Sequence, residues 1–396
     1  MAHLFIDFYM IKLIIRKKMY FIVFALLLSA AALFNACRQV NLPAFARIAP
    51  DDAALLAMLK VPDGYRIDFF APPGLGVKSP RQLAEGADGW VFSGSRAGKV
   101  YALKDADQDG KADEARIIAE GMKTPHGVAF ARGGLYIGAV DGVYFAENIV
   151  EKLNGGEAIA PKLLVSGFYE SPHHGARHIK TAPDGMLYVA LGVPCDICLP
   201  PLPDFTGVIR RYAPDGSGGE VFARGIRNAV GFDFHPQSGE LWFTDNGRDW
   251  LGDDLPSDEL NHAPRPDMHF GYPYCHQGDL PDPEFGAGKS CADYESPALL
   301  TGAHAANLGM AFDAEGKYVY IALHGSWNRS EKTGYAVYRA AVDANGGVSD
   351  YAPFAEGWLR EDGGVLGRPA DIVFLADGDM LVSDDFAHAI YRVSKT

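Results

Sequence analysis

Basic clusters, haem-attachment motifs and long apolar runs are scarce in this chain of 396 residues, and each scarcity excludes a class of protein. Outside the first twenty residues there is no run of Lys or Arg, and the formal net charge is −14, which excludes the basic footprint of a nucleic-acid-binding protein. None of the five cysteines stands in a C-x-x-C-H motif, so the chain carries no covalent c-type haem. The apolar run from Met19 to Phe34 is marginally short for a helix that spans a membrane.

The N-terminus is typical of an export signal. Three basic residues, at 16–18, precede the apolar run, which ends at "FNAC" (Phe34–Cys37). This pattern resembles a bacterial lipoprotein signal, in which Cys37 becomes the lipidated first residue, although Phe34 and Asn35 depart from the usual residues there. A plain signal peptide and an uncleaved anchor are the alternatives. We therefore predict a signal over 1–37, a tether with a short helix over 38–60 and a catalytic domain over 61–396. The expected location is periplasmic or at the cell surface, with the membrane reached through a lipid anchor.

Four cysteines remain after Cys37, and three interpretations of them compete. A redox-active Cys195-x-x-Cys198 pair would need a helix N-terminus, but the surrounding prolines indicate a loop. A four-cysteine zinc site is possible, but Cys275 and Cys291 lack the C-x-x-C spacing. In an exported protein we favour two local disulfides, Cys195–Cys198 and Cys275–Cys291.

Glycine is abundant, with 45 residues, and six stretches share one pattern of a strand, a turn with Gly or Asp-Gly, and a second alternating strand. They begin at Gly86, His126, His178, Val230, Leu308 and Ala370. Six copies at irregular intervals, with 48% hydrophobic residues to fill a core, predict an all-β fold, a six-bladed β-propeller. The extra strand "GYRIDFFAP" (Gly64–Pro72) is expected to complete the last blade and close the ring. An array of β-sandwiches is the alternative, but no linkers separate the copies.

In a propeller, the residues before each inner strand and after each second strand meet at one mouth of the central channel. These positions are occupied mainly by basic and amide groups, which suit an anionic, planar or sugar-like ligand. Before the inner strands stand His126, His174, Arg227-Asn228 and Arg368, and after the second strands stand Arg96, Asn246-Gly247-Arg248, His324 and Asp384-Asp385.

From about Val61 onward the chain resembles the soluble PQQ-dependent sugar dehydrogenases, and most closely their sorbosone or pyranose dehydrogenase-like branch. The resemblance is carried by "ARGIRNAVGFDFHPQSGELWFTDNGRDWLGDDLPSDELN", "HFGYPYCHQG", "ALHGSWNRSEKTGY" and "GRPADIVFLADGDMLVSDD". It implies a six-bladed propeller that holds PQQ, a tricarboxylate quinone, at the channel mouth with Ca²⁺ against its reactive carbonyl. The implied activity is the oxidation of a sugar or polyol-like substrate, with electrons passed to a separate acceptor such as a cytochrome or a quinone.

The resemblance also implies residue roles. His174 and Arg177 match the family's H-x-x-R setting, with His174 as the general base and Arg177 as a neighbour that shapes the site; an imidazole titrates near neutrality, as a proton acceptor should. His173 departs from the polar residue expected at its position. Cofactor contacts are implied for His126, Arg227, Asn228, His324, Arg329 and Arg368, and main-chain Ca²⁺ ligation is implied for Gly247 and Arg248.

Other interpretations of these residues remain open. Arg227 and Arg368 are alternatively structural partners of nearby acidic residues. His174 and His178 have the i, i+4 spacing of a metal pair on a helix, although Pro172, Gly175 and the following strand argue against a helix. For the whole chain, the rivals are a lactonase-like hydrolase, which needs carboxylates around one central metal, and a propeller that binds without turnover.

A second ion site is predicted independently of the resemblance. "DADQDGKAD" places Asp105, Asp107, Asp109 and Asp113 around a glycine, as at the start of a calcium loop. The terminal Glu of a full EF-hand is missing, and Arg116 stands in its place, so we expect Asp113 to substitute. The alternative is a solvated acidic turn.

Overall fold

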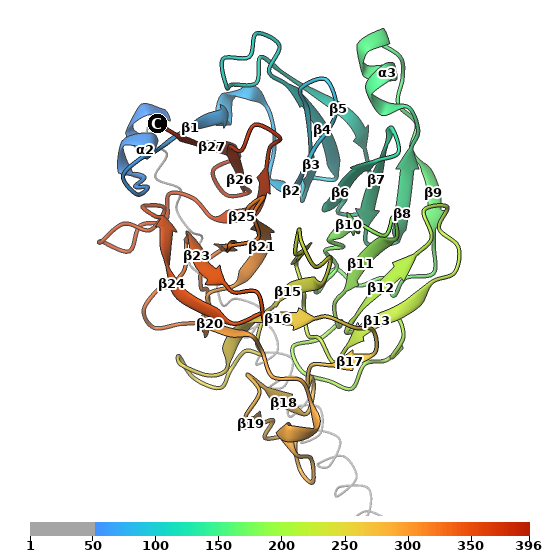
Figure 1. Ribbon diagram of the computed structural model, residues 1–396, viewed down its shortest axis with the longest axis vertical. Helices are drawn as coiled ribbons and strands as arrows, with labels where there is room; N and C mark the ends of the chain where they lie inside the picture. Colours follow the sequence, from blue (N-terminus) through green and yellow to red (C-terminus); the bar gives the residue numbers. More distant parts are fainter. Residues whose placement is uncertain (1–51) are drawn as a thin grey trace, which may run out of the picture. The chain divides into compact units, whose positions relative to one another are not determined.

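The repeated strand pairs fold into six sheets that follow one another around a ring, all antiparallel except for one short parallel pair, β13 with β17, in the third sheet (Figure 1). The computed structural model describes residues 52–396, so the predicted signal and Cys37 lie outside the described residues. The inner strands of neighbouring blades contact one another, as β2 does with β6 and β25. The predicted six-bladed β-propeller is confirmed.

Each blade is a meander that begins with its inner strand. Blades 1 to 3 contain β2 (Pro80–Glu85), β3 (Trp90–Ser95), β4 (Lys99–Lys104) and β5 (Glu114–Glu120); β6 (Gly127–Ala131), β7 (Gly134–Ala139), β8 (Gly142–Ala146) and β9 (Lys162–Val165); and β10 (Ile179–Thr181), β11 (Leu187–Leu191), β12 (Val208–Tyr212), β13 (Glu220–Arg224) and β17 (Met268–His269). Blades 4 to 6 contain β14 (Gly231–Phe234), β15 (Leu241–Asp245), β16 (Ser257–Ala263) and β20 (Leu299–Ala303); β21 (Asn307–Phe312), β22 (Tyr318–Leu323), β23 (Ala336–Val342) and β24 (Val348–Ala355); and β25 (Pro369–Phe374), β26 (Met380–Asp384), β27 (Ala389–Lys395) and β1 (Tyr65–Ala71).

The ring is closed by the first strand of the described chain. β1 pairs antiparallel with β27, the last strand, with Tyr65 opposite Lys395. The expected closing strand at Gly64–Pro72 is therefore present. Before it lies α2 (Asp52–Met58), the helix expected in the tether, and its buried Leu55 packs into the core between blades 5 and 6.

The hydrophobic core lies between the blades, because each sheet buries alternating side chains against both neighbours. Large indoles anchor three of these layers: Trp90 between blades 1 and 2, Trp242 between blades 4 and 5, and Trp358 between blades 5 and 6. All three are at most 1% exposed. This packing fixes the strand ends from which the loops of the site emerge.

Inserted segments interrupt the regular meander. The other α-helix of the described chain, α3 (Ile149–Gly155), separates β8 from β9, and short 3-10 turns lie at Pro73–Leu75 and Cys291–Asp293. Between β16 and β20 an insertion carries β17 and the hairpin of β18 (Cys275–His276) and β19 (Leu280–Pro281). In residues 52–396 no helix has the length and apolar character needed to cross a membrane.

The first repeat begins earlier than its sequence pattern suggested. The stretch from Gly86 contains β3 and β4, whereas the inner strand β2 lies before it, at Pro80–Glu85. β2 lacks the expected alternation because Arg81 and Gln82 are polar but buried at the channel. Both make specific hydrogen bonds there, Arg81 to Asp385 and Gln82 to the carbonyl of Ile179.

Candidate active site

One cavity lies where the inner strands begin and the second strands end. Its volume is about 410 Å³, and we call it the central cavity. Five blades contribute to its lining, so residues distant in sequence are brought together by the ring. The described residues that line it are Arg81, Arg96, Thr124, His126, Pro172, His174, Gly175, Ala176, Asn228, Val230, Leu308 and His324.

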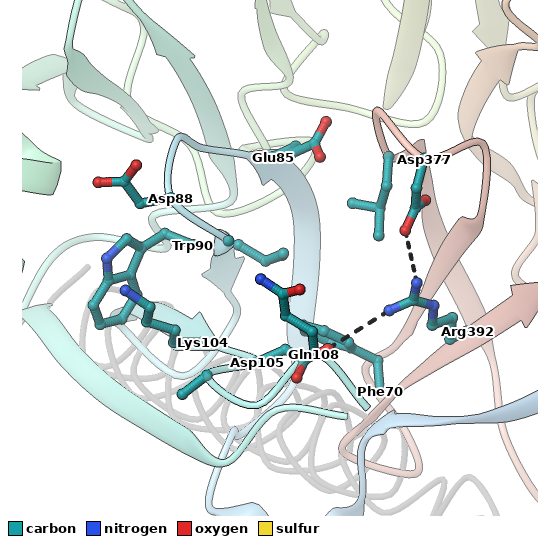
Figure 2. A pocket seen from close by; sticks show the side chains of 13 residues that line it. Phe70, Glu85, Asp88, Trp90, Lys104, Asp105, Gln108, Asp377 and Arg392 are labelled. Carbon is teal, nitrogen blue, oxygen red and sulfur yellow. Dashed lines mark hydrogen bonds and ion pairs between the residues drawn. The ribbon is translucent and has the colours of Figure 1, made fainter. Parts of the chain in front are cut away.

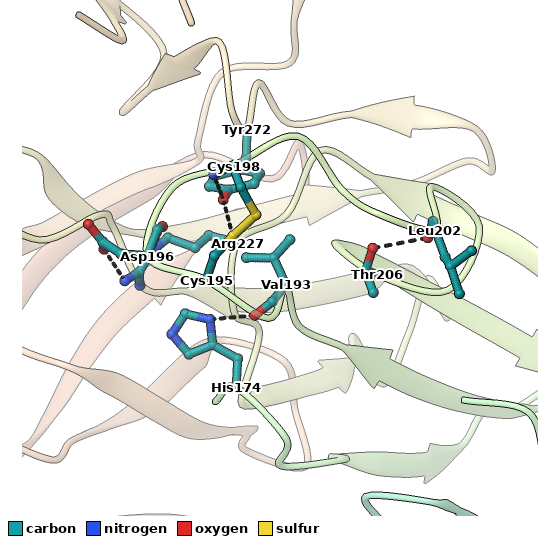
Figure 3. Close-up of a disulfide and its surroundings, with 9 residues drawn as sticks. All are labelled: His174, Val193, Cys195, Asp196, Cys198, Leu202, Thr206, Arg227 and Tyr272. Carbon is teal, nitrogen blue, oxygen red and sulfur yellow. Dashed lines mark hydrogen bonds and ion pairs between the residues drawn. A yellow bond between two sulfur atoms is a disulfide. The ribbon is translucent and has the colours of Figure 1, made fainter. Parts of the chain in front are cut away.

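His174 precedes β10 and lies between the central cavity and a neighbouring one. Its backbone is left-handed (φ 50°), and a Cβ on Gly192 would come within 2.8 Å of the His174 Cβ, so this approach requires glycine at 192. Nδ1 lies 2.9 Å from the Val193 carbonyl oxygen, which can only accept, so Nδ1 carries the proton (Figure 3). Nε2 of the neutral ring therefore has a free lone pair. Burial, and then the charge of Arg227, hold the pKa of His174 well below 6.5.

Arg177 lies outside the central cavity, behind the segment that carries His174. Its buried guanidinium donates to the carbonyl oxygens of Tyr169 (2.7 Å), Val140 (3.3 Å) and His174 (3.3 Å). Burial lowers the pKa of Arg177 to about 10, which still leaves the group charged at neutral pH. Arg177 thus holds the backbone of the histidine segment in place.

Three residues that line the central cavity share one carboxylate, that of Asp385, which follows β26. Its carboxylate accepts from Arg81 Nη1 at 2.8 Å and lies 2.7 Å from His324 Nε2, while Arg96 Nη1 is 3.6 Å away. The hydrogen bond from His324 and the charge of Arg81 hold the pKa of Asp385 well below its usual range against the effect of burial. Burial lowers the pKa of His324 to about 3, so the imidazole is neutral and the carboxylate ionised at neutral pH.

Arg81 is the principal residue that the sequence patterns missed, because its strand lay outside the recognised repeat. Its Nε donates to His126 Nδ1 at 3.3 Å, and burial lowers the pKa of His126 well below 6.5. The His178 side chain does not line the central cavity. Its ring packs on Phe232, with the two ring centroids 4.7 Å apart. His173 is exposed, and its ring centroid lies 4.0 Å from that of His174.

Arg227 and Asn228 precede β14 but have different surroundings. Arg227 Nε and Nη2 donate to the carbonyl oxygen and Oδ1 of Asp196, at 2.8 and 2.6 Å, and Nη2 lies 3.2 Å from Asp249. The structural interpretation of Arg227, as a partner of acidic residues, thus describes its observed contacts. Asn228 faces both cavities, and its buried Oδ1 has no hydrogen-bond partner among the described residues.

A second cavity of about 180 Å³ adjoins the central one and shares His174 and Asn228 with it. Oxygen-bearing groups are frequent in its lining, which comprises His173, His174, Arg227, Asn228, Asn246, Gly247, Asp249, Asp258, His304, Ala306, Trp327 and Asn328. The Gly247 amide donates to Asp258 Oδ1 at 2.8 Å. The Arg248 side chain points away and binds Asp282 and Glu284 at 2.6 and 2.9 Å, so any role of Arg248 here belongs to its main chain.

Two predicted cations line neither of these cavities. Arg368 donates to the carbonyl oxygens of His324 (2.9 Å) and Gly325 (2.6 Å), and so positions the end of β22. Arg329 lines a separate cavity of about 300 Å³ and lies 3.3 Å from Asp254. Its Nη1 also donates to the carbonyl oxygen of Asp253.

Exposed indoles stand at the rim of the second cavity. Trp327 lines the cavity and is 48% exposed, and Trp250 is 71% exposed. Their ring centroids are 5.5 Å apart in an edge-to-face arrangement, so each restricts the other.

The acidic loop lies elsewhere, between β4 and β5. Carboxylate oxygens of Asp105, Asp107 and Asp109 lie within 4.8 Å of one another, whereas Asp113 accepts from the Ala106 amide and is not part of this group. Arg392 approaches Asp105 at 3.8 Å, beside a cavity of about 660 Å³ (Figure 2). The loop thus holds three of the four predicted ligands together.

Both predicted disulfides, Cys195–Cys198 and Cys275–Cys291, are confirmed. The first belongs to the loop between β11 and β12 and lies beside Arg227 and Tyr272 (Figure 3). The Tyr272 hydroxyl accepts from the Cys198 amide at 2.9 Å. The second lies in the insertion between β16 and β20.

Comparison with known proteins identifies relatives along nearly the whole described chain. Residues 59–395 match the TrAA12-like family. A protein of Borreliella burgdorferi described as uncharacterized is 32% identical over 361 residues, covering 86% of this chain and 91% of the relative. The iodide structure of a Trichoderma reesei protein of Carbohydrate-Active Enzymes family AA12 shares the fold with TM-score 0.75 and 20% identity, over 85% of this chain and 98% of that one.

Two further structures share the propeller. The holo form of the pyranose dehydrogenase PQQ domain from Coprinopsis cinerea has TM-score 0.72 and 20% identity, over 88% of this chain and 99% of that domain. The PQQ-bound aldose sugar dehydrogenase from Streptomyces coelicolor has TM-score 0.60 and 18% identity, over 85% of this chain and 99% of that one. At these identities the likeness establishes the fold.

Proposed function

The chain belongs to the TrAA12-like family, and on that premise we propose that it is a PQQ- and calcium-dependent dehydrogenase of a sugar or related hydroxyl compound. The observation that carries the proposal is the pairing of an unprotonated imidazole nitrogen with a cavity lined by two guanidinium groups, those of Arg81 and Arg96. The first supplies a base for a hydroxyl proton, and the second suits an anionic cofactor.

The central cavity fits a planar tricarboxylate in its size, its charge and its walls. Its 410 Å³ lies within the usual range of small-molecule sites, and Val230 and Leu308 give it apolar surface. The Arg96 side chain is 61% exposed and only loosely held by Asp385, so it is available to a carboxylate. The orphaned Asn228 Oδ1 is an acceptor, so it suits a hydroxyl donor such as the substrate or a cation, and not a carboxylate of the cofactor. PQQ, when bound, would supply the two-electron acceptor that the chain itself lacks.

The second cavity fits a hard cation. Oxygen ligands are what Ca²⁺ requires, and the cavity offers carboxylates at Asp249 and Asp258 beside the backbone of Gly247. Because Gly247 lines this cavity, the arrangement supports the expected main-chain ligation at Gly247, whereas Arg248 is not among the lining residues. A bound Ca²⁺ would add positive charge next to His174 and Asn228, which line both cavities.

The chain's own contribution to the reaction is proton removal and orientation. His174 Nε2 takes the substrate hydroxyl proton, while Nδ1 remains bonded to the Val193 carbonyl oxygen. The resulting imidazolium is favoured by that same carbonyl. Arg177 holds the His174 carbonyl oxygen and so limits movement of the ring. The exposed indoles of Trp250 and Trp327 offer apolar faces on which the C–H face of a pyranose can stack, which supports a sugar as substrate.

A lactonase-like hydrolase is less well supported. Its metal would need converging carboxylates in the central cavity, but the described residues that line this cavity include no Asp or Glu. A propeller that binds PQQ without turnover shares the same residues, and only an activity measurement separates it from an enzyme.

The proposal includes export, a lipid anchor at Cys37 and a separate electron acceptor, a cytochrome or a quinone. The two disulfides support an oxidising compartment. Labelling with radioactive palmitate should mark the wild-type chain and not Cys37→Ser. Label in neither protein would contradict the anchor.

The function is tested by reconstituting the purified apo-protein with PQQ and Ca²⁺ and screening dye reduction over aldoses. We expect turnover that needs both additions, and PQQ binding at least tenfold weaker in Arg96→Ala than in the exposed control Arg66→Ala. PQQ binding without turnover on any sugar or polyol would favour the binding propeller. Absence of PQQ binding would refute the proposal.

A further inference from the structure

The Cys195–Cys198 loop contacts two residues of the candidate site through its backbone. The Val193 carbonyl oxygen accepts from His174 Nδ1 at 2.9 Å, and the Val193 amide donates to the Arg227 carbonyl oxygen at 3.0 Å. Figure 3 shows His174 beside Val193 and Arg227 beside Asp196. One short segment therefore contacts both the ring of His174 and the backbone of Arg227.

Asp196 makes the strongest of these contacts, and it lies between the two bonded cysteines. Its carbonyl oxygen and Oδ1 accept from two nitrogens of the buried Arg227 guanidinium, at 2.8 and 2.6 Å. The same Oδ1 accepts from the Asp249 amide at 2.9 Å. A single carboxylate thus joins Arg227 to the "NGRDW" loop, whose Gly247 and Asp249 line the second cavity.

We propose that the Cys195–Cys198 disulfide is a positioning device of the active site, which closes a small ring around Asp196 and thereby fixes Arg227, the "NGRDW" loop and the imidazole of His174. The covalent ring restricts the backbone of Asp196, so less conformational entropy is lost when Asp196 binds the guanidinium. Only the catalytic consequence rests on the proposed function, since the contacts themselves do not depend on it.

The proposal predicts that activity depends on the redox state of this one bond. A dithiol such as dithiothreitol would break the S–S bond with two electrons and two protons, forming two thiols while the reagent closes to its own disulfide. Cys275–Cys291 is the matched control, because it lies outside the loop that contacts His174 and Arg227.

The test compares Cys195→Ser/Cys198→Ser, the control Cys275→Ser/Cys291→Ser, Asp196→Ala, and the first pair combined with Asp196→Ala. We expect Cys195→Ser/Cys198→Ser to weaken PQQ binding at least tenfold and to lower kcat at least tenfold. Asp196→Ala should reproduce both losses, and Asp196→Asn should retain part of the activity. The combination should be no worse than either change alone, because both act through Asp196. Additive losses, or a loss as large in the control, would overturn the proposal.

A second measurement needs neither cofactor nor substrate. Hydrogen–deuterium exchange of the apo-protein should rise in residues 226–250 when the Cys195–Cys198 pair is replaced, and stay unchanged in the Cys275–Cys291 control. Faster exchange in a protein that never binds PQQ would support the positioning role and refute the proposed function. Unchanged exchange in residues 226–250 would refute the positioning role even if PQQ binds.

Discussion

Replacing His174 by alanine is expected to leave PQQ bound and to remove most of the turnover. The ring is fixed by the Nδ1 contact to Val193, so the lone pair on Nε2 is the basic atom that the structure provides. Loss of a general base typically lowers the rate by about 10²–10⁴. This corresponds to about 3–5 kcal/mol of activation free energy, at about 1.36 kcal/mol for each factor of ten.

The neighbouring histidines are matched controls for this change. His173 is exposed beside His174, and its replacement by alanine should leave kcat within about threefold of wild type. His178 is buried against Phe232, so His178→Ala should lower the melting temperature more than kcat. If the three histidines instead formed a metal site, all three variants would lose activity together with bound metal.

The assay is steady-state dye reduction with each reconstituted variant, together with PQQ titration and metal analysis of the same samples. A kinetic isotope effect on the transferred C–H hydrogen would establish that chemistry limits the rate. Near-normal kcat in His174→Ala under those conditions would refute the reasoning, and would make His126 and His324 the next bases to test.

Three further predictions concern other parts of the chain. Asp107→Ala with Asp109→Ala should remove one Ca²⁺ and lower the melting temperature while PQQ binding persists; unchanged calcium stoichiometry would indicate a solvated turn. Trp327→Ala should raise KM for a sugar about tenfold with little change in kcat, and an unchanged KM would exclude stacking there. His178 and His324 have pKa values lowered to about 3, so the unfolded chain binds protons that the folded chain does not. The contribution of each group to the free energy of unfolding should therefore fall as pH decreases from about 6.5 towards 3, by on the order of 1 kcal/mol per pH unit. The difference in stability between wild type and His178→Gln should shrink over that range, and a difference that calorimetry finds independent of pH would contradict this.

The fold was predictable because the blade pattern is local. Each copy carries its own turn and its own alternating strands, so a hairpin such as β14–β15 can be recognised without knowledge of its neighbours. The closing strand β1 was also recognisable, since it stood alone before the first copy. Strand β2 was missed because its buried Arg81 and Gln82 are explained by partners from blades 6 and 3, far away in the sequence.

The sequence predicts where the site residues stand along the blades, but it predicts their side-chain contacts less well. Sequence order places a residue at the mouth when it precedes an inner strand, and His126, His174 and Asn228 do line the central cavity. Sequence order does not indicate which groups a long side chain contacts. Arg368 stands at an equivalent position, yet its guanidinium donates to two backbone carbonyl oxygens. The partner of an arginine depends on loops from other blades, which no local pattern encodes.

Three arginines near the site contact the protein's own backbone. Arg177, Arg227 and Arg368 donate to backbone carbonyl oxygens, and so fix the segments that carry His174, Asn246 and His324. Their charge also disfavours protonation of nearby imidazoles; Arg227 contributes to the lowered pKa of His174, and Arg368 to that of His324. In the proposed complex the carboxylates of PQQ would raise the pKa of the His174 base. The positive charge of the nearby arginines opposes that effect and so helps to keep the base unprotonated. In the reaction proposed above, these arginines would therefore support catalysis without having to touch the reacting atoms.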